Sequence, residues 1–480
     1  RRSALPGRPS ALPVPAMPKR TASDAAPSVR FLKAAEGGSP AKGDWYPAVG
    51  SEARTQATVS EMLAAIREGG EAAALGYAEK FDKWPKDKAV LLSKDDIASI
   101  VDSLPQSVKD DVQYQYGRVK AFAQKSLESM HEFSTEVSPG TTLGQRLVPV
   151  STVGCYIPGG RFSHTSSAIM SITTAKVAGV KRVVACSPPM AGTSTVHPGT
   201  IYAMQLAGAD YILQMGGVQA IAAMAYGLFT EAGPADLLVG PGNALVAEAK
   251  RQLFGRLGID MFAGPTEIMV LADETADPYL VASDIVSQAE HGVTSPAWVI
   301  TTSEKLGQEV LKEVEKAVGR LMEAEPDSAC RAAWRDFGEV AVVRNREEMA
   351  ALSDLYAPEH LEVHCGDLDW WLATLRNYGS LFLGEETCVT YGDKCSGTNH
   401  ILPTRSVSRY SGGLSVDKFI KKLTWQRMTP EANRQVGAAA ARISRLEGME
   451  GHARAGDDRI AKYFPGETFE LQSEWKKRKM

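Results

Sequence analysis

Residues 211–254, YILQMGGVQAIAAMAYGLFTEAGPADLLVGPGNALVAEAKRQLF, decide the fold class of this chain. Short apolar runs at 211–214 and 236–239 have the length of buried strands, and the segments 217–228 and 243–254 have the spacing of helices. Strands that alternate with helices of about 10 to 12 residues are typical of βαβ units, in which the strands are parallel. The sequence therefore predicts an α/β fold.

The same alternation continues on both sides of this stretch. Upstream, the sequence predicts helices at 51–81, 106–130, 166–180 and 200–208, and strands at 89–92 and 182–186. Downstream of Gly264, it predicts strands at 267–272, 297–302, 339–344, 360–364 and 381–384, and helices at 278–290 and 304–321. From Asp417 to the end, the chain is expected to be helical and polar.

We expect two Rossmann-like domains with parallel sheets but without the G-x-G-x-x-G fingerprint, together with N-terminal helices and a C-terminal helical arm. The first domain is expected to be discontinuous, with residues 43–155 and 268–414. The second domain is expected to span 156–267, and the arm 415–480.

Residues 1–42 are expected to lie outside the fold, because they are rich in Pro, Ser, Ala and Arg and contain only Asp24 and Glu36 as acidic residues. They resemble an organelle-targeting extension, and the alternative is artefactual extra sequence. They lack the apolar core of a secretory signal. We therefore expect a cytoplasmic protein, or an organellar one if this segment is a targeting sequence.

Composition excludes several classes of protein. The 480 residues include 53 basic and 57 acidic ones, so the formal net charge of −4 argues against a nucleic-acid partner. No apolar run approaches the roughly 18 residues of a membrane span, so we expect no membrane partner. The six cysteines are scattered without a C-x-x-C pair, which is typical of a reducing compartment.

Three junctions between a predicted strand and the next helix are rich in glycine: 158–160 (PGG), 216–217 (GG) and 240–243 (GPGN). A helix N-terminus preceded by small residues presents free N–H groups, so these turns can hold the pyrophosphate of a dinucleotide. The alternative is that the glycines only allow tight turns. Three such turns on successive βα units favour a ligand at one edge of the sheet.

A metal-like set of residues lies in the second half of the chain. Gln288 and His291 end a helical run three residues apart, so both side chains can reach one ion. Asp393 lies in a short polar loop, and His452 lies in a glycine-punctuated stretch near the C-terminus. Such nitrogen and oxygen donors suit zinc, although a histidine at a helix end more often caps or packs.

Glu359 and His360 form a second candidate site. They pair a carboxylate with an imidazole where a strand is predicted to begin, and general acid–base catalysis near neutral pH needs this combination. The alternative is that they are two exposed polar residues at the start of a strand.

Seven blocks between about residues 50 and 465 resemble the histidinol dehydrogenase family. They are GCYIPGG (154–160), GGVQAIAAMAYG (216–227), VGPGNALVAEAKRQLFGRLGIDMFAGPTE (239–267), QAEHG (288–292), APEHLE (357–362), GDKCSGTNHILPT (392–404) and GGLSVDKF (412–419). The resemblance implies a dehydrogenase that uses NAD and one zinc ion per subunit and oxidises a primary alcohol to a carboxylate in two hydride transfers. It also implies a homodimer in which the C-terminal arm completes the neighbour's active site.

The resemblance also implies a role for each matching residue. The zinc ligands would be Gln288, His291, Asp393 and the partner subunit's His452, and the acid–base pair would be Glu359 and His360. Tyr156, Gln219 and Asn243 would contact NAD within the second domain, and Ser166, Thr266, His400 and Glu447 would face the substrate. In the implied mechanism, His360 takes the proton of the alcohol, and Glu359 with His360 activates the water that attacks the aldehyde.

Three departures from the family pattern bear on the substrate. Val389 stands where enzymes that act on histidinol usually have a glutamate, and Thr266 replaces a usual serine. Arg161, His164 and Lys394 add positive charge or polarity, which favours an anionic substrate. These details most resemble the sulfopropanediol dehydrogenase branch, which implies oxidation of 2,3-dihydroxypropane-1-sulfonate to sulfolactate. The alternative is oxidation of L-histidinol to L-histidine.

Two other classes of function compete with this interpretation. A non-catalytic binding protein is disfavoured because every implied ligand and the acid–base pair are present. A thiol-dependent aldehyde dehydrogenase would need Cys155 or Cys395 as its nucleophile, and neither has an evident activating base in the sequence.

Overall fold

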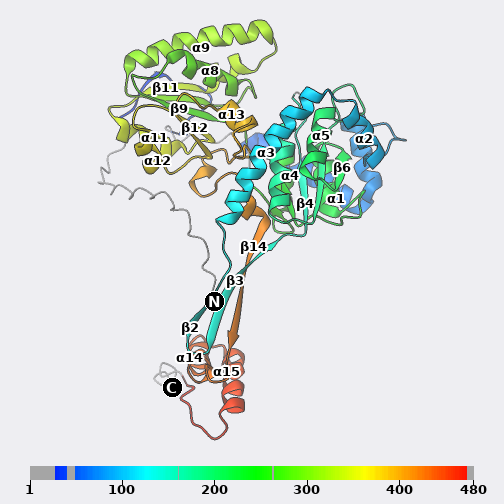
Figure 1. Ribbon diagram of the computed structural model, residues 1–480, viewed down its shortest axis with the longest axis vertical. Coiled ribbons are helices and arrows are strands. Elements are labelled where there is room, and N and C mark those ends of the chain that lie inside the picture. Colours follow the sequence, from blue (N-terminus) through cyan, green and yellow to red (C-terminus); the bar gives the residue numbers. More distant parts are fainter. Residues whose placement is uncertain (1–27, 41–48, 160–161, 262–263, 473–480) are drawn as a thin grey trace, which may run out of the picture. The chain divides into compact units, whose positions relative to one another are not determined.

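The structure is a computed structural model that describes residues 28–40, 49–159, 162–261 and 264–472 (Figure 1). The described residues form two compact units. One contains the chain up to Ser126 and Val150–Phe419, and the other contains Leu127–Pro149 and the chain from Ile420 onwards.

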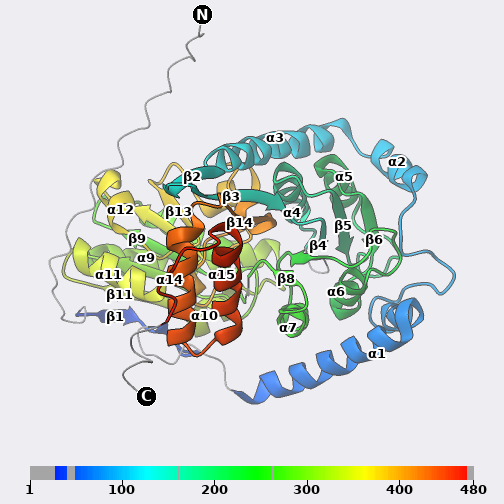
Figure 2. The ribbon, with the colours of Figure 1, turned by 90° about the horizontal axis from the view of Figure 1, so that it is seen from below.

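The first unit contains a five-stranded parallel sheet with the order β6-β5-β4-β7-β8. Its strands are β4 (Thr152–Tyr156), β5 (Arg182–Ser187), β6 (Tyr211–Gln214), β7 (Leu237–Val239) and β8 (Gly258–Ile259). Helices α4 (Thr165–Val177) and α5 (Pro198–Ala207) lie on one face, and α1 (Val49–Phe81), α6 (Gly217–Tyr226) and α7 (Ala244–Leu253) lie on the other (Figure 2). Because helices cover both faces, the central strands are buried on both sides and are mostly apolar.

The first unit also contains a six-stranded sheet with the order β1-β11-β10-β9-β12-β13. Five strands are parallel: β9 (Ile268–Ala272), β10 (Ala297–Thr301), β11 (Gly338–Val342), β12 (His360–His364) and β13 (Ser380–Leu383). Helices α8 (Pro278–Ala289), α9 (Glu304–Ala324) and α10 (Cys330–Phe337) pack on one face, and α11 (Arg346–Tyr356) and α12 (Leu368–Thr374) on the other (Figure 1). The predicted α/β fold with two parallel sheets is confirmed.

Strand β1 (Arg30–Lys33) is antiparallel to β11 and forms the edge of the six-stranded sheet. The prediction that residues 1–42 lie wholly outside the fold is therefore wrong for this stretch. Phe31 and Leu32 pack into the cores on opposite faces of the sheet. A strand of four residues within a polar segment is too short to show a clear alternation of apolar and polar residues in the sequence. Residues 1–27, 41 and 42 lie outside the described residues.

The second unit consists of an antiparallel sheet and two helices. The strands β2 (Phe133–Ser138), β3 (Thr141–Pro149) and β14 (Ile420–Met428) have the order β14-β3-β2. Helices α14 (Asn433–Leu446) and α15 (Glu450–Tyr463) pack against each other. The prediction of helix from Asp417 onwards is wrong for β14, which is exposed along most of its length and therefore lacks a clear apolar alternation.

Other differences from the predicted elements are local. Among the described residues, 89–92 forms only an isolated bridge from Leu91 to Leu213 rather than a strand. The helix α2 (Lys94–Asp102) was not predicted, although Ser93 and Asp96 form a capping box at its start. Helix α3 (Gln106–Glu128) ends two residues before its predicted end. No helix among the described residues is long and apolar enough to cross a membrane.

Candidate functional site

Glu359 and His360 lie where β12 begins, and both side chains are buried. Glu359 Oε2 accepts hydrogen bonds from Thr266 Oγ1 (2.6 Å) and from the backbone N–H of Glu267 (2.9 Å). His360 Nδ1 lies 3.5 Å from Glu359 Oε2 and 2.9 Å from the carbonyl oxygen of Glu267. Because a carbonyl oxygen only accepts, Nδ1 carries the proton in this contact and Nε2 faces away from it. The alternative of two exposed polar residues at a strand start is excluded.

Asp393, on the short helix α13 (Val389–Lys394), lies on the other side of the His360 ring. Asp393 Oδ1 is 3.4 Å from His360 Nε2. Gln288 lies in the last turn of α8, and its Oε1 is 3.4 Å from Thr266 Oγ1. The charges of Asp393 and His360 both act on the His291 imidazole. Asp393 therefore lies directly beside the acid–base pair, Gln288 is linked to it through Thr266, and His291 is within range of its charges.

Burial and nearby charge shift the pKa values of these groups. Burial raises the pKa of Glu359 to about 7. Burial lowers the pKa of His360, but the carboxylates of Glu359 and Asp393 outweigh burial and raise it to about 9. Burial lowers the pKa of His291 to about 4, which keeps the imidazole neutral and able to bind a cation. Burial opposes ionisation of Asp393, but His360 holds its pKa below the usual range.

The predicted substrate-facing residues occupy different positions in this cluster. His400 Nδ1 lies 3.0 Å from the carbonyl oxygen of Asp393, and His400 Nε2 lies 2.8 Å from Ser167 Oγ. Ser166 Oγ accepts a hydrogen bond of 2.8 Å from Gln115 Nε2. Thr266 donates its hydroxyl to Glu359, so it orients the carboxyl group as well as lining the site.

Three residues of the cluster were not predicted as site residues. Gln115 lies on α3 and donates to both Ser166 Oγ and the carbonyl oxygen of Lys394. Ser167 contacts His400, and the buried Glu267 contributes its backbone to both members of the acid–base pair. The sequence around Gln115 does not indicate its contacts with residues 51 and 279 positions away. Ser167 and Glu267, in contrast, are next in sequence to the predicted site residues Ser166 and Thr266.

Of the residues that bear on the substrate, His164 and Lys394 interact electrostatically with the same cluster. His164 is near His400 and His291, and burial lowers its pKa to about 4. Lys394 is exposed, and its charge acts on His291, His400 and Asp393. Val389 is buried and packs with the apolar core. Arg161 lies outside the described residues.

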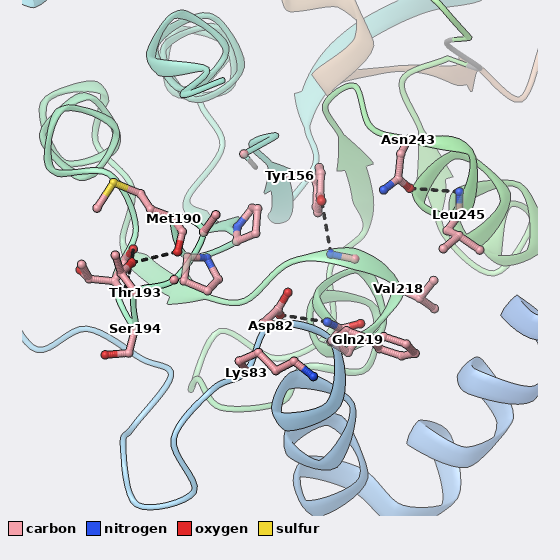
Figure 3. A pocket seen from close by; sticks show the side chains of 18 of the residues that line it. Asp82, Lys83, Tyr156, Met190, Thr193, Ser194, Val218, Gln219, Asn243 and Leu245 are labelled. Carbon is pink, nitrogen blue, oxygen red and sulfur yellow. Dashed lines mark hydrogen bonds between the residues drawn. The ribbon is translucent and has the colours of Figure 1, made fainter. Parts of the chain in front are cut away.

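Tyr156, Gln219 and Asn243 line one cavity of about 1070 Å³ at the carboxyl ends of β4, β6 and β7 (Figure 3). The Tyr156 hydroxyl accepts a hydrogen bond of 3.3 Å from the N–H of Gly217, at the start of α6. Asn243 caps α7, because its Oδ1 accepts from the N–H groups of Leu245 and Val246. The starts of α6 and α7 therefore both contribute to the wall of this cavity.

A segment far away in the sequence completes this cavity. Asp82 follows α1, and its Oδ2 accepts hydrogen bonds from the Gly216 N–H (3.1 Å) and from Gln219 Nε2 (3.0 Å) (Figure 3). Close packing also requires Gly240, because a Cβ at this position would lie 2.0 Å from the carbonyl oxygen of Tyr156. The turns at 216–217 and 240–243 are therefore tightly packed, and each contributes one residue, Gly217 or Asn243, to the cavity wall.

The two C-terminal candidates belong to the second unit. Glu447 ends α14 and His452 lies in the first turn of α15, and both are exposed. Gly448 between them has a φ of 82°, which interrupts the helix and is favoured by glycine. Gln288, His291 and Asp393 belong to the first unit.

The donor set fits a zinc ion. Asp393 Oδ1 is buried and has no hydrogen-bond partner among the described residues, so it is available as a ligand. An amide oxygen, a neutral imidazole and a carboxylate are donors that a borderline ion accepts, and three donors leave a further coordination position. The rival nucleophile Cys155 is fully buried, and burial raises the pKa of its thiol, so it does not suit nucleophilic catalysis.

Comparison with known proteins gives consistent matches. A profile of the family described as "Histidinol dehydrogenase" matches residues 48–460. The chain is 55% identical over 413 residues to a "Histidinol dehydrogenase homolog" of Pelagibacter ubique, and the match covers 86% of this chain and 95% of the relative. It is 53% identical over 416 residues to "Sulfopropanediol 3-dehydrogenase" of Ruegeria pomeroyi, with coverage of 87% and 94%. The solved structure of histidinol dehydrogenase from Elizabethkingia anophelis matches with a TM-score of 0.78 and 32% identity, covering 87% of this chain and 97% of that one.

Proposed function

Since the chain belongs to the histidinol dehydrogenase family and is an NAD-dependent oxidoreductase that takes an alcohol to an acid in two steps, we propose that its substrate is 2,3-dihydroxypropane-1-sulfonate and its product sulfolactate. The balanced reaction converts the primary alcohol, water and two NAD⁺ into the carboxylate, two NADH and three protons. The observation that carries the proposal is the buried cluster of Glu359, His360, Asp393 and Gln288.

The family uses zinc and NAD, and we assign zinc to Gln288, His291 and Asp393. When bound, zinc supplies a Lewis acid that makes the alcohol more acidic, and NAD⁺ supplies the hydride acceptor. The buried Asp393 Oδ1 without a hydrogen-bond partner among the described residues supports this assignment. The partner subunit's His452 would supply a further ligand, in keeping with its exposed position at a helix break.

The acid–base roles are assigned to Glu359 and His360. His360 Nε2 is the nitrogen without a backbone partner, so it is the atom that accepts the proton of the alcohol. A base must be deprotonated, and neutralising Asp393 with a cation removes one of the two charges that raise the pKa of His360. Glu359, held by Thr266 and the Glu267 N–H, orients and deprotonates the water of the second step.

Tyr156, Gln219 and Asn243 are assigned to NAD, because all three line the cavity of about 1070 Å³ that begins at two helix N-termini. Gly159 also lines this cavity, and the ring of Phe162, three residues later in the sequence, lies 6.3 Å from that of His291. This short separation along the chain supports a nicotinamide that reaches from the cavity toward the acid–base pair.

The chemistry around the cluster supports an anionic substrate. Val389 offers no carboxylate, so a cationic substrate amine lacks a counter-ion there. Lys394 adds positive charge beside His291 and His400, and the neutral His164 can donate a hydrogen bond to a sulfonate. We assign Ser166, His400 and the partner subunit's Glu447 to the hydroxyl groups of the substrate.

The test is a comparison of substrates with the zinc-loaded full chain and NAD⁺. We expect two NADH per molecule of 2,3-dihydroxypropane-1-sulfonate, sulfolactate as the product, and a kcat/KM at least tenfold above that for L-histidinol. The Lys394→Met variant should lose preference for the sulfonate through a raised KM. Turnover of L-histidinol without turnover of the sulfonate would overturn the substrate assignment and leave the family reaction intact. Sedimentation of the protein as a monomer that is fully active would overturn the shared site.

A further inference from the structure

A second cluster of buried polar side chains follows the acid–base pair along strand β12. Strand β12 presents His360, Glu362 and His364 on one face, because side chains alternate along a strand. Asp284 lies on α8, one turn before Gln288, and α8 packs in the core on this side of the sheet (Figure 1). Asp284, Glu362 and His364 therefore converge on one point that the proposed reaction does not use.

The spacing of their ligand atoms is close to that of a metal site. His364 Nε2 lies 3.7 Å from Glu362 Oε2 and 3.8 Å from Asp284 Oδ2, and the three atoms all lie within 4.8 Å of one another. Zinc bonds of about 2.0 to 2.1 Å in a tetrahedral site hold ligand atoms roughly 3.3 Å apart. His364 Nε2 is therefore within about 0.5 Å of this spacing from one oxygen of each carboxylate.

Three polar atoms of the cluster, on Glu362 and His364, have no hydrogen-bond partner among the described residues. Glu362 Oε1 accepts a hydrogen bond of 2.8 Å from the Val389 N–H, which fixes the carboxylate, but Glu362 Oε2 has no partner among the described residues. The same holds for both ring nitrogens of His364. The side chains of Glu362 and His364 are 0% and 1% exposed. Such unpaired buried atoms are costly unless something binds them.

Burial also shifts the pKa values of the three groups. Burial, and the nearby Asp284, raise the pKa of Glu362 well above its usual range, and burial raises the pKa of Asp284. Burial keeps the His364 imidazole neutral, which is the form that binds a cation. The Asp284 side chain is 17% exposed, so the cluster is accessible from solvent on one side.

We propose that Asp284, Glu362 and His364 bind a second divalent cation of the zinc class, distinct from the ion assigned to Gln288, His291 and Asp393. Two carboxylates and an imidazole supply three donors, and water through the exposed side of Asp284 supplies the fourth. Because β12 carries both the second site and His360, and α8 carries both Asp284 and Gln288, the ion ties together the two elements that hold the catalytic cluster.

The test measures metal content rather than activity. The full chain is stripped of metal by a strong chelator, loaded with Zn²⁺ alone, desalted and analysed by elemental mass spectrometry. We expect two zinc ions per chain for the wild type, and one each for Glu362→Gln and His364→Gln. Glu386→Gln is the matched control, because this exposed carboxylate acts on His364 by its charge but is not part of the triad, and it should keep two.

The variant Asp393→Asn separates this site from the other one. It should also retain one zinc ion, and the double variant Asp393→Asn/Glu362→Gln should retain none. A wild-type content of one ion that is lost only with Asp393 would overturn the proposal, and would mean that Asp284 and Glu362 share a proton instead. Equal zinc content in the wild type and in both Glu362→Gln and His364→Gln would also overturn it. Circular dichroism checks folding, and if one variant is unfolded the other decides.

Discussion

Replacing Glu359 by glutamine tests the assignment of the acid–base pair most directly. The amide keeps the volume of the side chain and an oxygen that accepts from Thr266 Oγ1 and the Glu267 N–H, at 2.6 and 2.9 Å in the wild type. It removes the negative charge 3.5 Å from His360 Nδ1 and the basic oxygen. The catalytic rate is therefore expected to fall much more than the stability of the fold.

The magnitude follows from the role assigned to the carboxylate. Loss of one general acid–base group lowers kcat about 10²- to 10⁴-fold, which is about 3 to 5 kcal/mol of activation free energy. Because the two hydrogen bonds to Glu359 survive, the free energy of unfolding should change by no more than about 1 kcal/mol. The rate of the second step, in which water attacks the aldehyde, should fall more than the rate of the first step.

The assay follows NADH formation from the alcohol and, separately, from the aldehyde, with urea unfolding of the same samples. Glu347→Gln is the matched control, since this exposed carboxylate lies on α11, the helix before Glu359, and should leave kcat unchanged. A Glu359→Gln variant that retains more than a tenth of the wild-type kcat would refute the assignment. A loss of activity matched by an equal loss of unfolding free energy would refute it too.

Three further outcomes are expected. Chelation of divalent metal should abolish NADH formation but leave NAD⁺ binding, measured by calorimetry, intact. The reason is that the cavity lined by Tyr156 does not include the metal-binding residues, and loss of both NADH formation and NAD⁺ binding would contradict it. Asn243→Ala removes the cap of α7 and should lower the unfolding free energy by about 1 kcal/mol in urea titrations, with a weaker affinity for NAD⁺, and an unchanged stability would count against the cap. Burial raises the pKa of Glu267 from its ordinary 4.5 to about 8, so between these values unfolding releases a proton and stability falls as pH rises, by about 1.4 kcal/mol per unit. From about pH 5 to pH 8, the wild type should therefore lose roughly 4 kcal/mol more than Glu267→Gln in unfolding experiments, and parallel pH profiles would disprove the shift.

The parts of the fold that could be predicted are those with a strong local pattern. Strand β5 is a buried and mostly apolar run between two helices of ordinary length, so its type and its start follow from the sequence, and it ends one residue later than predicted. Strand β14 is exposed over most of its length and pairs with β3 more than 270 residues earlier. Neither the exposure of β14 nor its distant partner produces a local sequence pattern that predicts a strand. The sequence therefore predicts helix for these residues, as it does for the residues that follow.

The residues of the candidate site also divide into those whose positions follow from the sequence and those whose positions do not. Tyr156, Gln219 and Asn243 follow strands of one parallel sheet, and topology alone brings the carboxyl ends of such strands together at one edge. Gln115 and Asp82 enter from N-terminal helices whose approach depends on tertiary packing. Their contacts could not be derived from spacing, because each joins segments separated by 51 or more residues.

Strand β1 limits how far the N-terminal segment can be shortened without exposing an edge of the six-stranded sheet. Its backbone pairs with β11, and Phe31 and Leu32 help to seal the two cores of the six-stranded sheet. Loss of Arg30–Lys33 would remove this strand and expose backbone groups of β11, which could then pair with a strand of another molecule. A shortened chain that keeps this edge of the six-stranded sheet covered must therefore retain Arg30–Lys33.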